Sequence, residues 1–141
     1  MKYVSLLFFF VFSQTVFSQT GFTKDSLSVS RVISFQQKAD FKDYQVQFKD
    51  VVSDSRCPKD VMCVRAGEAK VALSIYKEGV FIKDKEIIID ASGFVIEANN
   101  LAFDANDFKV YGMTLKPYPK TSKAIPKETY SIEVIFQPKT L

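Results

Sequence analysis

The chain contains no histidine and no tryptophan among its 141 residues, and it has only two cysteines. Histidine is the commonest general base near neutral pH and the commonest metal ligand, so its absence removes the usual catalytic and metal-binding groups. The sequence also lacks a G-x-S-x-G nucleophile motif, an H-E-x-x-H zinc motif and a phosphate-binding loop. We therefore expect no catalytic residue, no metal and no cofactor, and a protein that is not an enzyme.

The sequence also lacks an excess of charge and a long apolar run. The formal net charge is only +3, which does not suggest a nucleic-acid partner. The longest apolar stretch, residues 3–12, is shorter than the roughly 20 residues of a membrane span. It follows Lys2 and precedes Val16-Phe17-Ser18, which is the order of a secretory signal peptide. We expect a signal peptide at residues 1–18 and an exported chain, periplasmic or secreted, from residue 19.

The mature chain, residues 19–141, has the length of one ordinary domain and shows strand patterns throughout. Apolar residues alternate with polar ones, or form short β-branched runs, in the segments 27–35, 44–48, 69–76, 80–82, 87–89, 94–96, 108–115 and 130–136. The remaining segments are expected to be turns at 38–42 and 84–85, a loop with one helical turn at 97–107, and a lysine-rich loop at 118–129. No long stretch has the helical period. The pattern predicts an all-β domain, an antiparallel immunoglobulin-like β-sandwich of about seven or eight strands with one disulfide.

Individual residues predict where strands bend or end. Asp50 interrupts the alternation of its strand, which indicates a bulge, and Gly112 stands where the inward face changes. Gly79 is suited to a tight hairpin. Pro117 and Pro119 cannot donate to a central ladder and should end the strand before them.

Both cysteines lie in the least ordinary stretch, residues 54–68. Cys57 and Cys63 enclose five residues, and in an exported chain they are expected to form a disulfide. Closing so short a loop contributes roughly 2.4 kcal/mol in the loop-entropy model. A soft-metal site with Met62, or a redox pair, is the alternative, although thioredoxin-type pairs have two intervening residues.

Charged residues surround the cysteines. We assign Asp54, Arg56, Asp60, Arg65 and Glu68 to a candidate recognition loop, in which Arg56 can pair with Asp54 or Asp60. If Arg56 belongs to the contact surface, its replacement by alanine weakens partner binding and leaves the melting temperature nearly unchanged.

Two further sets of charged residues are weaker candidates. A basic stripe around the late prolines either is simply solvated or meets an anionic polysaccharide or lipopolysaccharide. It consists of Lys116, Lys120, Lys123 and Lys127. The carboxylate pair Asp84 and Glu86 could in principle support hydrolysis of a glycoside, but most chains contain such pairs.

The stretch from Asp54 to Ala69 matches most of the pattern D-S-R-C-P-x-x-V-x-C-x-W-A-G-x-A. The matching positions are Asp54, Ser55, Arg56, Cys57, Pro58, Val61, Cys63, Ala66, Gly67 and Ala69, and later Leu115–Pro119 and Tyr130. In these positions the chain resembles a family of small exported bacterial proteins with no established activity. The resemblance implies export and a β domain, and it transfers no catalytic role. Arg65 stands where the family pattern has tryptophan.

These observations predict a non-enzymatic, exported β-sandwich that acts as a binding or inhibitory module. Its partner is expected to be a protein or another component of the cell envelope, and the chain is expected to be a monomer. The alternative is a periplasmic metal-binding or redox protein that uses Cys57 and Cys63.

Overall fold

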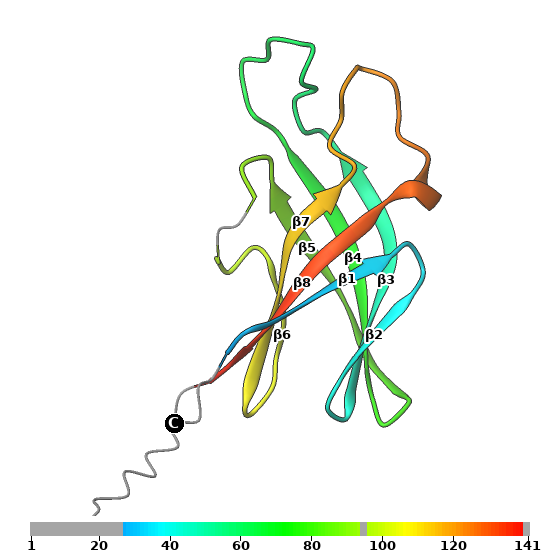
Figure 1. The fold of residues 1–141 in the computed structure, drawn as a ribbon, viewed down its shortest axis with the longest axis vertical. Coiled ribbons are helices and arrows are strands. Elements are labelled where there is room, and N and C mark those ends of the chain that lie inside the picture. Colours follow the sequence, from blue (N-terminus) through cyan, green and yellow to red (C-terminus); the bar gives the residue numbers. More distant parts are fainter. Residues whose placement is uncertain (1–26, 94–95, 140–141) are drawn as a thin grey trace, which may run out of the picture.

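A computed structural model of the chain describes residues 27–93 and 96–139, which form eight strands and one short helical turn (Figure 1). The strands are β1 (Val29–Ser34), β2 (Lys38–Phe41), β3 (Tyr44–Asp54), β4 (Glu68–Lys77), β5 (Val80–Asp90), β6 (Leu101–Asp104), β7 (Phe108–Lys116) and β8 (Ser131–Pro138). The 3-10 turn η1 (Lys127–Thr129) precedes β8.

The strands form two four-stranded antiparallel sheets, ordered β1-β8-β7-β6 and β2-β3-β4-β5. Consecutive strands are neighbours within each sheet, and the chain changes sheet after β1 and after β5. The two sheets pack face to face as a β-sandwich (Figure 1). The predicted antiparallel β-sandwich with one disulfide is therefore confirmed.

The alternating residues of the long strands build the core between the sheets. Val71, Leu73 and Ile75 of β4 are fully buried, as the alternation of this strand predicted. Phe108 and Phe136 from the other sheet meet Phe41 in an aromatic cluster at one end of the core. Burying such side chains contributes about 1.5–3 kcal/mol each.

Three elements differ from the sequence prediction. Residues 38–41 form the edge strand β2 rather than a turn, because an edge strand exposes one side and tolerates charged residues. Residues 80–90 form one long strand, β5, instead of two strands with a turn at 84–85. Its first half is exposed, including the apolar residues Val80, Phe81 and Ile82, but it still pairs with β4. Residues 101–104 form strand β6 where a loop was expected.

The irregularities predicted from single residues are present. The register of β3 against β4 shifts between Phe48 and Asp50, and again between Val51 and Ser53. That of β7 against β8 shifts directly after Gly112. Gly79 has a φ of 79° in the β4–β5 hairpin, and β7 ends before Pro117.

Two loops project together from one end of the sandwich, at the top of Figure 1. One connects β3 to β4 and contains both cysteines, and the other connects β7 to β8. The β4–β5 hairpin lies at the opposite end. The predicted signal peptide and residues 94–95 of the predicted strand at 94–96 lie outside the described residues. No helix in the described part of the chain is long and apolar enough to cross a membrane.

Candidate functional site: the disulfide loop

The β3–β4 connection, which we call the disulfide loop (residues 55–67), is closed by a bond between Cys57 and Cys63. This confirms the predicted disulfide. Both sulfur atoms are used in it, so in this state neither is available as a thiolate to a metal or to a disulfide-exchange partner. Only the remaining groups of the loop can act at its surface.

Arg56 fixes the base of this loop from inside the molecule, where its side chain is buried with 3% of its surface exposed. Its Nε and Nη2 atoms donate to the two carboxylate oxygens of Asp54 at 2.8 and 2.7 Å. Nη1 donates to the Leu115 carbonyl at 2.6 Å. Such a bidentate ion pair with further hydrogen bonds meets the requirements for burying a charge.

The remaining Arg56 contacts extend to the loop after β7. Nη2 also donates to the Pro117 carbonyl at 3.1 Å, and the guanidinium lies 4.9 Å from the centre of the Tyr118 ring. The Tyr118 hydroxyl in turn donates to the Cys57 carbonyl at 2.9 Å. Arg56 therefore joins the end of β3, the end of β7 and the start of the disulfide loop.

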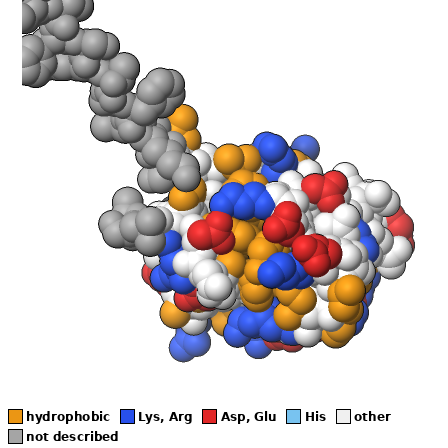
Figure 2. Space-filling view, turned by 90° about the horizontal axis from the view of Figure 1, so that it is seen from below, with side chains coloured by type: hydrophobic (Ala, Val, Ile, Leu, Met, Phe, Trp, Pro, Cys, Tyr) orange, Lys and Arg blue, Asp and Glu red, His pale blue; other side chains and the backbone are white. Residues whose placement is uncertain are grey.

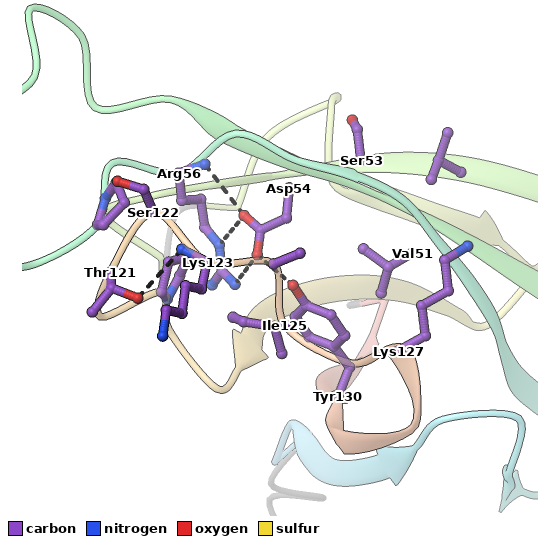
Figure 3. Close-up of a pocket in the computed structure, with 14 residues that line it drawn as sticks. Val51, Ser53, Asp54, Arg56, Thr121, Ser122, Lys123, Ile125, Lys127 and Tyr130 are labelled. Carbon is purple, nitrogen blue, oxygen red and sulfur yellow. Dashed lines mark hydrogen bonds and ion pairs between the residues drawn. The ribbon is translucent and has the colours of Figure 1, made fainter.

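Tyr130, just before β8, completes this network by donating its hydroxyl to Asp54 Oδ2 at 2.8 Å (Figure 3). Burial alone raises the pKa of Asp54, but the hydrogen bonds from Arg56 and Tyr130 and the positive charge of Arg56 outweigh it. The net effect is a pKa below the usual value. Burial, followed by the bond to Asp54, raises the pKa of Tyr130 to about 12. The network thus favours an ionised Asp54 and a protonated Tyr130.

Backbone hydrogen bonds continue the β3–β4 hairpin into the loop. The Ser55 amide donates to the Glu68 carbonyl, and the Cys57 amide donates to the Ala66 carbonyl, both at 2.8 Å. Gly67 permits this close approach because its φ is 74° and a Cβ atom there would overlap the Ser55 carbonyl. At the base of the loop, the two backbone segments therefore run close together and are hydrogen-bonded to each other.

The disulfide loop is also hydrogen-bonded to its neighbour, the β7–β8 loop. The amides of Lys59 and Asp60 donate to the carbonyls of Pro119 and Lys120, each at 3.1 Å. Two loops that are about sixty residues apart in sequence therefore form one surface.

The far part of the loop, which we call the tip (residues 61–65), lies beyond the hydrogen bonds to the β7–β8 loop, and the disulfide at Cys63 ties it back to Cys57. The Met62 and Val64 side chains are fully exposed, and that of Val61 is partly exposed. Arg65 is exposed too. The tip therefore presents apolar side chains to solvent on a loop that is fixed at its base.

The structure divides the five residues of the candidate recognition loop. Asp60 and Arg65 are exposed, and Glu68 is half-buried at the start of β4, where its carbonyl accepts from Ser55. Asp54 and Arg56 pair with each other, one of the two pairings considered, but they lie inside. This placement reverses the expectation for Arg56→Ala, since a buried ion pair affects folding first. The recognition role of the exposed residues stays a prediction.

Sequence reasoning missed how Tyr130 and the carbonyls of Leu115 and Pro117 take part in the site. One signal in the sequence could have indicated this network, namely the positions on which the resemblance to the exported family is based. These positions, which include Asp54, Arg56, Leu115–Pro119 and Tyr130, meet in space at the base of the loop.

A groove of about 380 Å³ runs beside the base of the loop, between the end of β3 and the segment before β8 (Figure 3). Asp54 and Tyr130 line it together with Lys123 and Ile125. Within the described residues, no buried side-chain nitrogen or oxygen lacks a hydrogen-bond partner. The groove thus offers no buried polar group with a free hydrogen-bonding position for a ligand. This makes it a weaker candidate for a binding site than the tip.

The carboxylate pair of the hydrolase alternative gains no support. Asp84 accepts hydrogen bonds from Lys49 and Ser74, which hold its pKa below the usual value. A general acid requires a raised pKa instead. In residues 27–93 and 96–139, no three His, Cys, Asp or Glu residues are grouped so that they could hold a metal ion.

Comparison of the chain with protein-family models, with curated proteins and with solved structures found no match. The family resemblance of the cysteine stretch therefore stays a prediction.

Proposed function

We propose that this protein is an exported, non-enzymatic binding or inhibitory module whose contact surface is the end of the sandwich that carries the disulfide loop. The observation that supports this most is the contrast within the loop. A buried ion pair and hydrogen bonds hold its base and a disulfide closes it, while Met62 and Val64 at its tip are fully exposed. A fixed loop loses little conformational freedom on binding, which favours affinity.

Export is supported by two observations. The N-terminal sequence has the order of a signal peptide, and a disulfide in a small domain is typical of oxidising compartments. The bacterial origin that the resemblance implies makes the periplasm or the culture medium the place to look for the partner.

The proposal is tested by capture from periplasmic extract and culture medium, with the chain from Gln19 as bait. This form is the predicted mature chain and contains every described strand. The variant Met62→Ser/Val64→Ser should capture about tenfold less of the specific partner, because a few side chains buried in an interface carry most of its binding energy.

The matched control is Val80→Ser/Phe81→Ser, which also replaces two exposed apolar residues but lies at the opposite end. It should capture the partner as well as the unchanged chain does. If the tip variant captures as much as the control, the contact surface lies elsewhere and the proposal fails.

A further inference from the structure

The shape of the apolar tip limits what can cover it. Val61, Met62 and Val64 sit on a single loop that projects beyond both sheets (Figure 1). A stable protein interface covers roughly 800 Å² on each partner, and it is usually a broad surface. A narrow projecting tip with a few aliphatic side chains is better suited to inserting into a deformable surface, such as that of a lipid bilayer.

Positive charge lies on the disulfide loop and on the segment hydrogen-bonded to it. Segments 57–65 and 116–125 together carry five exposed cations and one exposed carboxylate, that of Asp60. The cations are Lys59, Arg65, Lys116, Lys120 and Lys123. They lie near one another because the two segments are hydrogen-bonded through Lys59, Asp60, Pro119 and Lys120. This end therefore concentrates positive charge in a chain whose formal net charge is only +3.

Some lysines elsewhere in the molecule are paired, while others, such as Lys38, Lys70 and Lys77, form no ion pair among the described residues. Lys42, Lys49, Lys127 and Lys139 each form an ion pair with an aspartate. Within the part of the chain that the structure describes, none of the five cations near the tip pairs with a carboxylate. Figure 2, which views the opposite end, shows side chains of both signs next to each other there. The side chains of these five cations are thus available to contact an external anion.

The combination of residue types favours a lipid surface over a protein. Four of the five cations are lysines, a residue that is depleted at protein interfaces. Reversible membrane attachment has two components, apolar residues that enter the headgroup region and nearby lysines that attract anionic lipids. The long lysine side chains can keep their ammonium groups in the headgroup layer while the tip goes deeper.

We infer that the partner of this end is an anionic phospholipid bilayer surface, which Met62 and Val64 enter while Lys59, Arg65, Lys116, Lys120 and Lys123 contact the headgroups. This inference rests on the proposed function, because it names the partner of the same surface. Attachment is peripheral, and the sandwich stays outside the bilayer with its disulfide-loop end facing the lipid.

Fluorescence offers a direct test, since the chain has no tryptophan. Met62→Trp and Val80→Trp, both made in the chain from Gln19, each carry a single indole, one at each end of the molecule. With vesicles of phosphatidylcholine and phosphatidylglycerol, the emission of Met62→Trp should shift to shorter wavelength, and that of Val80→Trp should not. Pure phosphatidylcholine should give no shift, and added salt should reverse the shift because it screens the charges.

Vesicle sedimentation gives an independent measurement without an added indole. Met62→Ser/Val64→Ser and Lys120→Ser/Lys123→Ser should each bind anionic vesicles about tenfold more weakly. Val80→Ser/Phe81→Ser should bind like the unchanged chain.

An unshifted Met62→Trp emission at saturating anionic vesicles, or equal binding to phosphatidylcholine alone, overturns the lipid inference. If the capture experiment still finds a protein that depends on Met62 and Val64, the partner is that protein and the proposed function stands. If neither vesicles nor extracts show dependence on the tip, both proposals fail.

Discussion

In the disulfide loop the usual distribution of residue types is reversed: a charged residue is buried at the base, and apolar residues are exposed at the tip. Arg56 at the base is charged and buried, while Met62, six positions later, is apolar and fully exposed. Long charged side chains are almost never buried unless they are paired. Here Asp54 and the carbonyls of Leu115 and Pro117 supply the pairing. The comparison teaches that the buried charge of Arg56 serves folding, while the exposed apolar residues of the tip contribute nothing to the core.

The two regions should therefore respond differently to substitution. A buried ion pair is strongly coupled to its surroundings, because removing one partner leaves the other desolvated and unsatisfied. An exposed apolar side chain has no such partner, so its removal changes the free energy of unfolding little. Variants at the base should unfold the molecule more readily, and variants at the tip should alter only what it binds.

The largest effect is expected for Arg56→Ala. It leaves Asp54 buried without its cation and two carbonyls without their donor, so the free energy of unfolding should fall by about 3–5 kcal/mol. The melting temperature should drop by more than about 10 °C. Thermal and urea unfolding measure both quantities.

Arg65→Ala is the matched control for that substitution, since Arg65 is an exposed arginine of the same loop. It should change the free energy of unfolding by less than about 0.5 kcal/mol. Equal losses for the two variants would remove the distinction between base and tip.

Removing the disulfide is expected to have the next largest effect on the free energy of unfolding. Cys57→Ser/Cys63→Ser removes the covalent closure, and the loop-entropy model gives a loss of about 2 kcal/mol. The base keeps its ion pair and hydrogen bonds, so the variant should still fold cooperatively, as circular dichroism during urea unfolding will measure. A variant that fails to fold would show that the ring, and not Arg56, holds the base.

Tyr130→Phe should cost about 1.5 kcal/mol, because it removes a hydrogen bond to the ionised Asp54. In the unchanged chain the pKa of Tyr130 is raised to about 12, so folding favours the protonated phenol. This contribution is complete below the unfolded pKa of about 10 and is lost as the pH rises through about 12. The difference in unfolding free energy between the two chains should therefore shrink across this pH window. A constant difference up to pH 12 would argue against the bond to Asp54.

The smallest effect on stability is expected at the tip. Met62→Ser/Val64→Ser should change the free energy of unfolding by less than about 0.5 kcal/mol, since both side chains are fully exposed. Urea unfolding next to the unchanged chain measures the difference. A loss of several kcal/mol would mean that these side chains are packed in the folded protein, and the tip would then be part of the core.

The strands could be predicted from the sequence wherever one face is buried. Val71, Leu73 and Ile75 alternate with more exposed residues, and the period itself places them in the core. The edge strand β2 was missed because Lys38 and Asp40 look like turn residues when the pairing with β3 is unknown. The strand at 80–82 was predicted, but the middle of β5 was misjudged for the same reason, since Asp84 and Lys85 look like turn residues and only their pairing with β4 makes them part of a strand.

The disulfide could be predicted, but the burial of Arg56 could not. The cysteine pairing follows from two cysteines in a chain with an export sequence. Arg56, in contrast, stands among turn formers and charges, and two of its acceptors lie 59 and 61 positions away. No local pattern reports a contact with a backbone carbonyl, because every residue has one. Only the folded chain brings β7 next to the loop.

The two register shifts in β3 have a consequence for the side of this strand that β2 leaves uncovered. β2 pairs with Tyr44–Gln47, and among the described residues no strand pairs with 50–54 on that side. An open sheet edge can take up a strand from another molecule and start aggregation. Bulges interrupt the even spacing of donors and acceptors that such a strand would need, and they twist the edge. We therefore expect the shifts at Phe48/Asp50 and Val51/Ser53 to make this edge a poor template for a strand of another molecule.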